Sequence, residues 1–244
     1  MSQAEKIYEG KAKIIYATQE PEILLTYYKD DATAFNAQKR GTIKGKGEIN
    51  CKIAATLFQL LSSAGIPNHY IDQPAANEMR VKAVSIIPIE VVVRNIAAGS
   101  LCRQTGLAEG KILSKPLVEF YLKNDELGDP LLTCDRLFLL ELTTPAQLEE
   151  IETMTRKINE LLKEFFKSCN IILVDFKLEF GLDCAGKLLL ADEISPDTCR
   201  LWDAQETDPG ARILDKDRFR RDLGQIESAY QQVLQRIMTA VNEK

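Results

Sequence analysis

The chain contains 244 residues, of which 45% are apolar and 27% charged, a composition typical of a folded globular protein of one or two domains. Its 31 Lys and Arg residues and 36 Asp and Glu residues give a net charge of −5. This charge argues against a protein that wraps nucleic acid or coats an anionic membrane, although it leaves room for a local basic pocket.

Histidine and cysteine usage narrows the chemistry further. A single histidine excludes a zinc site built from several histidines, and the six cysteines are widely spaced without a C-x-x-C pair. The charged N-terminal stretch lacks the apolar core of a secretory signal, and no apolar run approaches the ~20 residues of a membrane helix. We therefore expect a cytoplasmic protein with reduced thiols that binds neither nucleic acid nor a membrane.

The first third of the chain is predicted to contain strands, a loop and one helix. Two short strands lie within residues 6–17, a third covers 23–29, and the polar residues 31–50 have the character of a long loop. An apolar stripe at helical spacing predicts a helix over 49–64 that ends at Gly65.

The rest of the chain mixes strand and helix patterns, which predicts an α+β fold. The most regular helix pattern follows Thr144, where Pro145 and Gln147 complete a capping-box sequence. The remaining predicted elements are strands over 79–84, 86–96 and 118–123, a short helix from Ser100, a helix over 145–168, a hairpin over 171–182 and 187–194, and a final helix over 217–241.

The predicted hairpin carries a row of charged side chains on one face. Alternation places Asp175, Lys177 and Glu179 about 6.6–6.8 Å apart, opposite an apolar face that begins with Val174. A two- or four-residue turn would pair Glu179 with position 192 or 190, so Asp192 reaches the polar face in either case. The carboxylates could share Mg²⁺, although the pattern alone is more typical of a sheet with one solvated face.

A second candidate site lies in the apolar segment 87–100, which Glu90 and Arg94 interrupt. It ends in a run of small residues before Ser100, and a helix capped by Ser100 would offer free N–H groups to a phosphate within reach of Arg94. Alternatively, Glu90 and Arg94 form an internal ion pair beside an ordinary helix cap.

Two further segments could contact a ligand. Lys11 and Lys13 follow the Gly10 turn and could neutralise a polyphosphate, but two solvated lysines on a surface hairpin would look the same. The loop after the acidic hairpin carries Asp197 and Arg200, which could bind a ligand or simply form turns.

Two other features give weaker indications of function. The glycine- and lysine-rich segment 41–47 lacks the spacing of a P-loop. We assign no role to His69, because a lone histidine at the start of a strand is more often structural than catalytic.

Several long segments together resemble the SAICAR synthetase family. IPIEVVVRNIAAGS and LVDFKLEFG resemble its two diagnostic motifs, and YEGKAKIIY, TAFNAQKRGTIKGKGEIN, FYLKND, DEISPDTCRLWD and DKDRFR resemble other family segments. They occur in the family order over nearly the whole chain. The resemblance implies a two-lobed α+β fold similar to ATP-grasp and kinase-like proteins, with ATP in a cleft between an N-terminal lobe, 1–84, and a C-terminal lobe, 85–244.

The resemblance also implies a reaction. The family joins L-aspartate to carboxyaminoimidazole ribonucleotide (CAIR) with ATP and Mg²⁺, through an acyl phosphate, and releases SAICAR, ADP and phosphate in de novo purine biosynthesis. Catalysis of this kind depends mainly on positioning and on charge neutralisation. We further expect a homo-oligomer.

The resemblance implies roles for particular residues. Those expected to hold the ATP phosphates are Gly10, Lys11 and Lys13, with Lys123 also touching ATP. Glu179 and Asp192 would bind Mg²⁺, while Arg94, Ser100 and Arg200 would bind the phosphate of CAIR. Lys177 and Asp197 would face the imidazole carboxylate of CAIR, supported by Asp175.

The resemblance leaves the roles of some residues unassigned. Gly128 and Cys51 depart from the family pattern, so the residues that bind aspartate stay unassigned. We expect the glycine-containing segment 44–50 to act as a lid, with Lys46 needed for turnover more than for folding.

Two other functions compete with the ligase. A small-molecule kinase could use a similar ATP cleft and would form ADP without aspartate. A non-enzymatic nucleotide-binding module is less consistent with intact carboxylates at Glu179 and Asp192.

Overall fold

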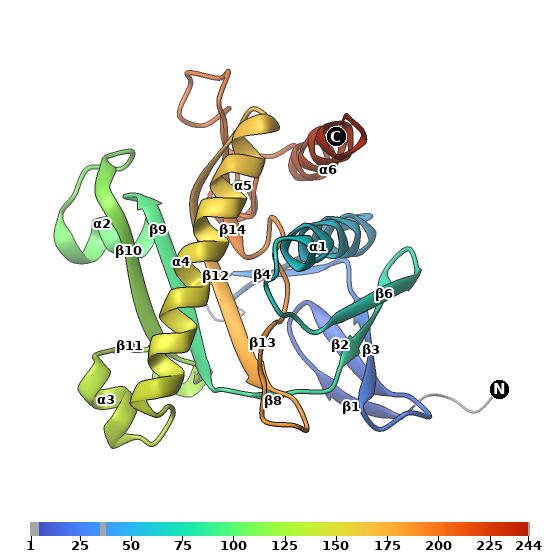
Figure 1. The fold of residues 1–244 in the computed structure, drawn as a ribbon. Helices are drawn as coiled ribbons and strands as arrows, with labels where there is room; N and C mark the ends of the chain where they lie inside the picture. Colours follow the sequence, from blue (N-terminus) through green and yellow to red (C-terminus); the bar gives the residue numbers. More distant parts are fainter. Residues whose placement is uncertain (1–4, 35–37, 244) are drawn as a thin grey trace.

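The computed structural model describes residues 5–34 and 38–243 and is built around two sheets (Figure 1). The first sheet lies wholly in the N-terminal third of the chain and is antiparallel throughout. In spatial order it contains β1 (Lys6–Glu9), β2 (Lys13–Ala17), β3 (Ile23–Tyr28), β7 (Glu78–Lys82) and β6 (Tyr70–Ala75).

The second sheet is also antiparallel and is centred on the longest strand of the fold, β12 (Ile171–Leu182). In spatial order it contains β11 (Leu131–Leu132), β10 (Ile112–Leu122), β9 (Ile89–Ile96), β12 and β13 (Leu188–Ala191), while β8 (Ser85–Ile86) and β14 (Cys199–Asp203) also pair with β12. A separate small hairpin joins β4 (Asp31–Ala34) to β5 (Lys39–Thr42).

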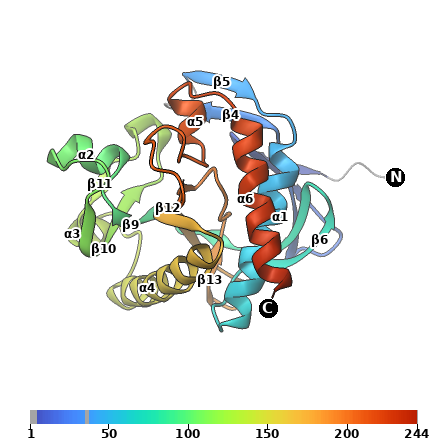
Figure 2. The same ribbon diagram turned by 90° about the horizontal axis from the view of Figure 1, so that it is seen from above.

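The helices cover the sheets from different parts of the chain, which confirms the predicted α+β class. The long helix α4 (Pro145–Ser168) runs across the second sheet, and α1 (Lys46–Ser63) lies beside the C-terminal helix α6 (Ile226–Asn242) (Figures 1 and 2). The shorter helices are α2 (Gly99–Thr105), α3 (Cys134–Leu139), α5 (Asp217–Arg220) and a 3₁₀ turn at Asp125–Leu127.

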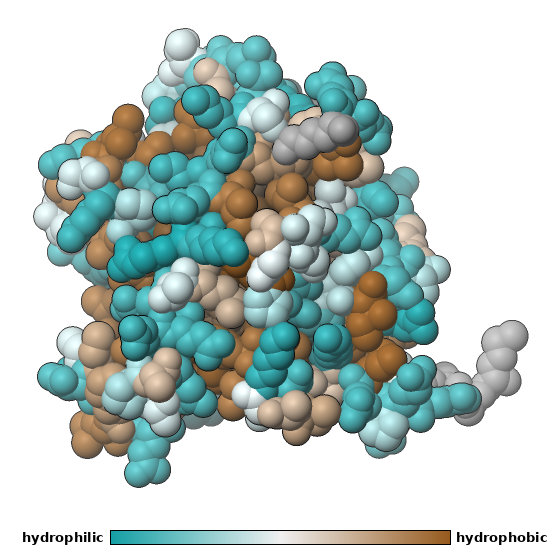
Figure 3. Space-filling view, in the orientation of Figure 1, coloured by the Kyte–Doolittle hydropathy of each residue, from teal (hydrophilic) through white to brown (hydrophobic). Residues whose placement is uncertain are grey.

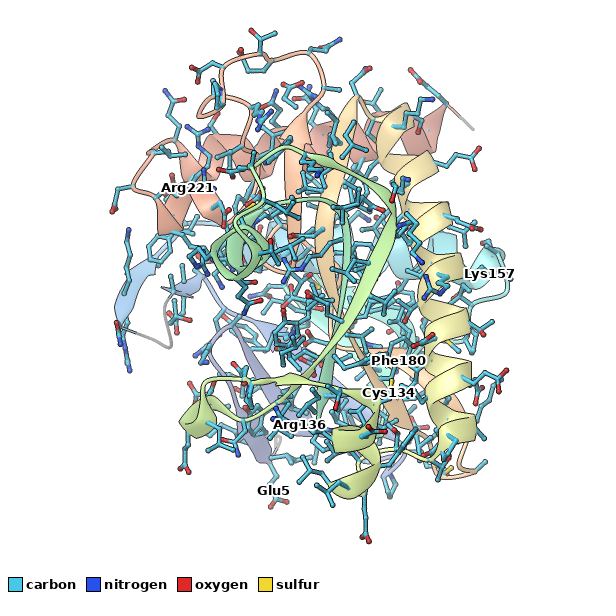
Figure 4. All side chains as sticks on the ribbon, turned by 90° about the vertical axis from the view of Figure 1, so that its left-hand side faces the viewer. Glu5, Cys134, Arg136, Lys157, Phe180 and Arg221 are labelled. Atoms are coloured by element: carbon cyan, nitrogen blue, oxygen red, sulfur yellow. The ribbon has the colours of Figure 1, made fainter. Side chains whose placement is uncertain are left out.

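Helix α4 begins and ends where the sequence predicts. Thr144 Oγ1 accepts a hydrogen bond from the Gln147 N–H at 3.2 Å, and Gln147 Oε1 accepts one from the Thr144 N–H at 3.0 Å. This confirms the capping box. The helix is amphipathic: Lys157 projects from α4 away from the sheet, whereas Phe180 of β12 lies inside the molecule (Figure 4).

One apolar core joins the two sheets. It includes Tyr28 and Met79 from the first sheet and Phe176, Leu178 and Phe180 from β12, all almost fully buried. Outside, polar and apolar side chains alternate over the face seen in Figure 3. None of the helices within the described ranges is long and apolar enough to span a bilayer. All six cysteines are free, as predicted.

The predicted loop over 31–50 is wrong. Most of it folds as the β4–β5 hairpin and the first turn of α1, while 35–37 fall outside the described residues. The hairpin forms because Ala32, Ala34 and Ile43 bury against Phe219 in a small separate core. Residues this small give little periodic signal, so the sequence pattern concealed the strand.

The predicted single helix over 217–241 is also wrong, because α5 and α6 are separate. Gly224 and Gln225 both adopt positive φ, at 68° and 51°, which ends one helix and starts the next. Arg218 stabilises this break: its Nε donates to the Gly224 carbonyl at 2.7 Å and its Nη1 donates to the Ile213 carbonyl at 3.0 Å.

Several predicted strand boundaries shift for local reasons. Pro88 cannot donate a ladder hydrogen bond, so the predicted strand 86–96 divides into β8 and β9. Strand β10 begins already at Ile112. The sequence pattern missed its first half, because that half is largely exposed and contains Pro116, which is unfavourable in a strand. In β12 the register shifts between Leu173 and Asp175, so Val174 joins a separate cluster rather than the face expected for it.

Candidate functional site

A cleft of about 900 Å³ is lined by both sheets. The first sheet contributes its β1–β2 turn and β2, and the second contributes β9, β10, β12 and the segment after β13. The residues that were expected to bind or support the substrates all line this cleft: Gly10, Lys11, Lys13, Arg94, Ser100, Lys123, Asp175, Lys177, Glu179, Asp192, Asp197 and Arg200. Tertiary structure therefore brings into one place segments that are far apart in the chain.

Lysines and carboxylates alternate at one end of the cleft. Lys177 Nζ lies 2.5 Å from Glu179 Oε1, 3.1 Å from Asp192 Oδ2 and 3.2 Å from Glu90 Oε1. Lys13 pairs with Asp192 and lies 3.1 Å from Glu193 Oε1, while Lys123 pairs with Glu179. We call this set the lysine–carboxylate cluster; its members are Lys13, Lys123, Lys177, Glu90, Glu179, Asp192 and Glu193.

Asp192 reaches the cluster by a route that the sequence did not indicate. Glu179 pairs with Ala191, not with position 190 or 192, because the hairpin closes by pairing Leu182 with Leu188. Asp192 follows the strand with φ 60°, and this left-handed residue turns its side chain into the cleft. A non-glycine residue in this conformation is uncommon and often marks a functional site.

Opposite charges control ionisation in the cluster. Burial opposes charge on Asp192, but Lys13 and Lys177 hold the pKa of its carboxyl group well below the ordinary range. Burial likewise opposes charge on Lys177, but Asp192, Glu179 and Glu90 raise the pKa of its ammonium group. Both residues are therefore charged at neutral pH.

The carboxylates of the cluster fit a divalent cation. Within the described ranges, no group of three or more His, Cys, Asp and Glu side chains is arranged as a ready metal site. Glu179 and Asp192 nevertheless converge on one cation, the Lys177 ammonium. Oxygen donors without histidine or thiolate suit Mg²⁺, which commonly takes one or two carboxylates together with phosphate oxygens.

The other end of the cleft is a network of arginines and carboxylates. Arg94 is 3% exposed; it donates from Nε to Glu119 Oε2 at 2.6 Å and from Nη1 to Asp175 Oδ2 at 3.1 Å. Its Nη2 donates to Ser100 Oγ at 2.8 Å and to the Tyr121 hydroxyl at 3.2 Å. The alternative of an internal Glu90–Arg94 ion pair does not hold, since Glu90 pairs with Lys177 instead.

Arg200 extends this network. Its Nη1 donates to Asp175 Oδ2 at 2.8 Å and its Nε donates to Asp217 Oδ2 at 2.9 Å. A Cβ on Gly99 would lie 2.3 Å from Arg200 Nη2, so the glycine leaves the space that the guanidinium occupies. Ser100 lies inside the first turn of α2, whose N-cap is Ala98, which corrects the predicted Ser100 cap.

A third group of charges surrounds Asp197. Asp197 accepts from the Tyr230 hydroxyl at 2.8 Å and from Lys46 Nζ at 2.9 Å, and Lys216 Nζ lies 3.8 Å away. Burial opposes charge on Asp197, but Lys216 and Lys46 hold the pKa of its carboxyl group well below the ordinary range. Because Lys46 belongs to α1 and its side chain is 1% exposed, the predicted lid over 44–50 is wrong.

Asp215 is connected to the arginine network through Asp217, which binds both Asp215 and Arg200. It is fully buried and accepts from the Leu201 N–H at 2.7 Å and from the Asp217 N–H at 2.8 Å. Burial and the neighbouring Asp217 raise the pKa of Asp215 to about 7. Burial opposes ionisation of Asp217 too, but Arg200 and Arg220 lower the pKa of Asp217 to about 2.

The sequence did not identify several residues that line or support the cleft. Glu193 and Lys216 stand in segments already noticed, where their spacing offered no sign of which side chains turn inward. Glu119 and Tyr121 meet Arg94 only through the pairing of β10 with β9, so no local pattern could have found them. Lys46 was expected to serve turnover as part of a lid, but its contact with Asp197 depends on long-range packing. His69 also lines the cleft, although the sequence suggested no role for it.

Comparisons with known proteins identify the family of the chain. The sequence model of the SAICAR synthetase family matches residues 6–237. The chain is 66% identical over 244 residues to the phosphoribosylaminoimidazole-succinocarboxamide synthase of Trichormus variabilis, and the match covers 100% of both chains.

Solved structures give the same result. The crystal structure of phosphoribosylaminoimidazole-succinocarboxamide synthase from Ehrlichia chaffeensis is 45% identical, with a TM-score of 0.92 over 96% of this chain and 98% of that one. A SAICAR synthetase in complex with ADP is also 45% identical, with a TM-score of 0.90 over 94% of this chain and 96% of that one.

Proposed function

Because the chain belongs to the SAICAR synthetase family and is a ligase of purine biosynthesis, we propose that its cleft joins L-aspartate to CAIR at the expense of ATP. The γ-phosphoryl group passes to the imidazole carboxylate of CAIR, which gives an acyl phosphate and ADP. The amine of aspartate attacks the acyl carbon, a proton leaves the nitrogen, and phosphate departs. Both steps need positioned reactants and neutralised charge more than covalent help from the protein.

The lysine–carboxylate cluster is the proposed site for the ATP phosphates. Lys13 and Lys123 both hold carboxylates here, and a polyphosphate would compete for their ammonium groups. Lys11, beside the Gly10 turn, forms an exposed ion pair with Asp125, which it would exchange for the phosphates. The pairs seen here would then exchange: lysines move to phosphate, and Glu179 and Asp192 become available to a cation.

Mg²⁺ is the proposed cation, held by Glu179 and Asp192. When bound, it would neutralise charge on the transferred phosphoryl group. The related SAICAR synthetase in complex with ADP supports nucleotide binding in this fold.

The arginine network is the proposed site for the phosphate of CAIR. Arg94 and Arg200 meet at Asp175, so two guanidinium groups are held side by side near the Ser100 hydroxyl. Fork-shaped donors in this arrangement suit a phosphate group. Asp175 keeps them in place without contacting the substrate in our proposal.

CAIR bound in this way would span the cleft. Its imidazole carboxylate would reach Asp197 and Lys177, the member of the cluster that follows Asp175 on the same face of β12. The observation that carries the proposal is this joint arrangement: one cleft presents an arginine pair at one end and lysines with two convergent carboxylates at the other.

An ADP-release assay tests the proposal. With ATP and Mg²⁺ present, we expect ADP release only when CAIR and aspartate are both supplied. Release that needs CAIR but ignores aspartate would point to a kinase of the acyl or sugar-phosphate kind, and release without either would contradict the ligase. Omitting Mg²⁺ should abolish turnover, and adding it back should restore it.

The cellular location and the oligomeric state of the protein are two further predictions. We propose that the protein works in the cytoplasm, which the six free thiols support. We also propose a homo-oligomer, which light scattering at several protein concentrations would test. Exposed leucines on α3 and β11, with Leu139 80% exposed, offer an apolar surface that a second copy could cover.

A further inference from the structure

Lys216 and Arg220 both line the cleft, and the function proposed above assigns neither of them to a substrate. Lys216 directly precedes α5, and Arg220 is the last residue of that helix. The Arg220 N–H donates to the Lys216 carbonyl at 3.0 Å, so the two residues are one helical turn apart. Side chains at this spacing lie on the same face of a helix. The two cations therefore reach the cleft as a pair.

The ammonium group of Lys216 has no close hydrogen-bond acceptor. Its Nζ lies 3.8 Å from Asp197 Oδ2, which is longer than a hydrogen bond. Both oxygens of Asp197 are already bound, since Oδ1 accepts from the Tyr230 hydroxyl at 2.8 Å and Oδ2 accepts from Lys46 Nζ at 2.9 Å. Among the residues that the structure describes, none accepts a hydrogen bond from Lys216 Nζ. Its donors are therefore available to a ligand in the cleft.

The charges around Lys216 favour a bound anion. The side chain is only 14% exposed. Burial lowers the pKa of its ammonium group below the ordinary value, and the neighbouring cations Arg220 and Lys46 lower it too, although Asp197 and Glu193 oppose this shift. The carboxylates of the protein therefore compensate the charge of Lys216 incompletely, and an anion beside it would supply what they lack.

Arg220 is held in place and still has donors available. Its Nη1 donates to Asp217 Oδ1 at 2.6 Å, while Asp217 Oδ2 accepts from Arg200 Nε at 2.9 Å. The side chain of Arg220 is 32% exposed, and within the described ranges its Nη2 has neither a hydrogen bond nor an ion pair. A guanidinium carries five N–H donors in one plane. Asp217 can therefore orient Arg220 while other donors of the group bind a ligand.

Helix α5 is a fixed support for the two cations although it is only one turn long. It lies beside the β4–β5 hairpin (Figure 2), because Phe219 packs in the small core with Ala32 and Ala34. The Phe219 carbonyl also accepts from Lys39 Nζ of β5 at 2.6 Å. A binding site needs supporting contacts of this kind to hold its donors at a constant separation.

We propose that Lys216 and Arg220 bind the two carboxylate groups of L-aspartate. This inference rests on the proposed function and deepens it, because that function assigns the arginine network to CAIR and the lysine–carboxylate cluster to ATP and Mg²⁺. Lys216 lies beside Asp197, which faces the imidazole carboxylate of CAIR in the proposed function. Aspartate held by Lys216 would therefore present its amine close to the acyl carbon.

The chemistry of the pair matches this substrate. Aspartate carries two carboxylates close to the carbon that bears its amine, and two cations one helical turn apart can each take one of them. Hydrogen bonds between charged partners are stronger than those between neutral ones. Both carboxylates would be held away from the reacting carbon, and the amine would stay free to attack.

Three variants and a matched control test the site. Lys216→Met removes the charge and keeps an apolar side chain of similar length, whereas Lys216→Arg keeps a cation. Arg220→Gln removes the charge of the second residue. Arg221→Gln is the control, because Arg221 forms its closest ion pair with Glu109 at the surface and is not among the residues that line the cleft.

The measurement is ADP release with ATP, Mg²⁺ and CAIR at saturation and aspartate varied, followed by the same assay with CAIR varied. We expect Lys216→Met and Arg220→Gln each to raise the KM for aspartate about 10- to 100-fold, because each loses a hydrogen bond to a charged group. The KM for CAIR should change far less. Lys216→Arg should recover most of the loss, and Arg221→Gln should match the parent.

Thermal unfolding of each full-length variant shows whether it is folded. If Lys216→Met does not fold, the comparison of Arg220→Gln with Arg221→Gln decides the question. A KM for aspartate that is the same in Arg220→Gln, Lys216→Met and the control would overturn the site. A rise confined to the KM for CAIR would also overturn it, since the two residues would then belong to the phosphate site. Failure of the parent to require both CAIR and aspartate for ADP release would overturn the proposed function instead.

Discussion

Arg94 shows how single residues set the properties of the cleft. The guanidinium is almost fully buried, yet Glu119, Asp175, Ser100 and Tyr121 all accept hydrogen bonds from it. Removing one partner from a buried charge network costs more than the network contributes as a whole, because the remaining charges lose their compensation. The same residue therefore matters for stability and for the proposed phosphate site.

Arg94→Lys should test the need for a fork-shaped donor. Lysine keeps the charge, but one ammonium group cannot serve the acceptors on both sides of Arg94. We expect the KM for CAIR to rise at least tenfold and the free energy of unfolding to fall by about 2–3 kcal/mol. Steady-state kinetics and urea unfolding would measure both effects. Arg103→Lys, on the exposed side of α2, is the matched control, and a KM equal to that of the parent in both variants would contradict this role for Arg94.

Asp215 makes a pH-dependent contribution to stability. Its folded pKa of about 7 lies above the ordinary value of 3.8, so between these values the folded state holds a proton that the unfolded state has released. The resulting stabilisation is complete below about pH 4 and is lost as the pH rises through about 7. Since one pKa unit corresponds to about 1.4 kcal/mol, the loss is at most about 4 kcal/mol.

Asp215→Asn should remove this slope. We expect the variant to be less stable overall, because an amide nitrogen would face a backbone N–H where the carboxyl group accepts two hydrogen bonds. The difference in free energy of unfolding between parent and variant should shrink as the pH rises from 4 to 7. His69, whose pKa burial and Lys13 lower to about 4, contributes the opposite slope to both proteins and cancels in the difference. A difference that stays constant with pH would refute the raised pKa.

At the scale of elements, the first turn of α1 both packs against β3 and supplies Lys46 to the cleft residue Asp197. The carboxylate of Asp30 accepts from the Gly45 N–H at 3.0 Å and from the Gly47 N–H at 2.9 Å, so it caps the helix from outside. Gly47 lies so close to β3 that an added Cβ would be 2.4 Å from the Tyr28 carbonyl oxygen. This close approach carries Lys46 into the interior, where it meets Asp197.

Gly47→Ala should therefore damage stability and activity together. The clash is with backbone, which cannot rotate away, so we expect a loss of about 3 kcal/mol in the free energy of unfolding. Displacement of Lys46 should also lower kcat. Gly210→Ala is the control, because the nearest atom to its added Cβ is Asp208 Oδ1 at 3.4 Å. Urea unfolding and ADP release measure the two effects, and equal stability of the two variants would contradict the close packing of α1.

At the scale of the whole molecule, the last helix of the chain packs beside the first one. Helix α6 lies beside α1 (Figure 2), and Tyr230, Val233 and Ile237 of α6 are fully buried in the common core. The division into lobes 1–84 and 85–244 stays a prediction. The boundary falls between β7 and β8, where one sheet ends and the other begins, but α6 covers a helix of the first part.

Deletion of residues 226–244 should leave a chain that does not fold cooperatively. Each large apolar side chain removed from a core costs about 2–5 kcal/mol, and a domain has only about 5–15 kcal/mol in total. Circular dichroism melting and limited proteolysis would detect the loss. Tyr230→Phe is the milder comparison, because it keeps the packing and removes only the hydrogen bond to Asp197. A sharp unfolding transition in the truncated chain would show that α6 is dispensable.

The sequence by itself determined what depends on neighbours along the chain. The capping box fixed the start of α4, and alternation in β12 placed Asp175, Lys177 and Glu179 on the side that faces the cleft. The family motifs likewise indicated the residues that line it. These features depend on periodicity and on hydrogen bonds a few residues apart, which a sequence displays directly.

Tertiary structure alone decided which of these residues meet. The burial of Lys46, the pairing of Arg94 with Glu119 rather than Glu90, and the left-handed turn at Asp192 all depend on contacts between distant segments. The β4–β5 hairpin forms for the same reason, since Phe219 near the other end of the chain covers it. Burial and charge partnership are properties of the packed molecule, so no local pattern encodes them.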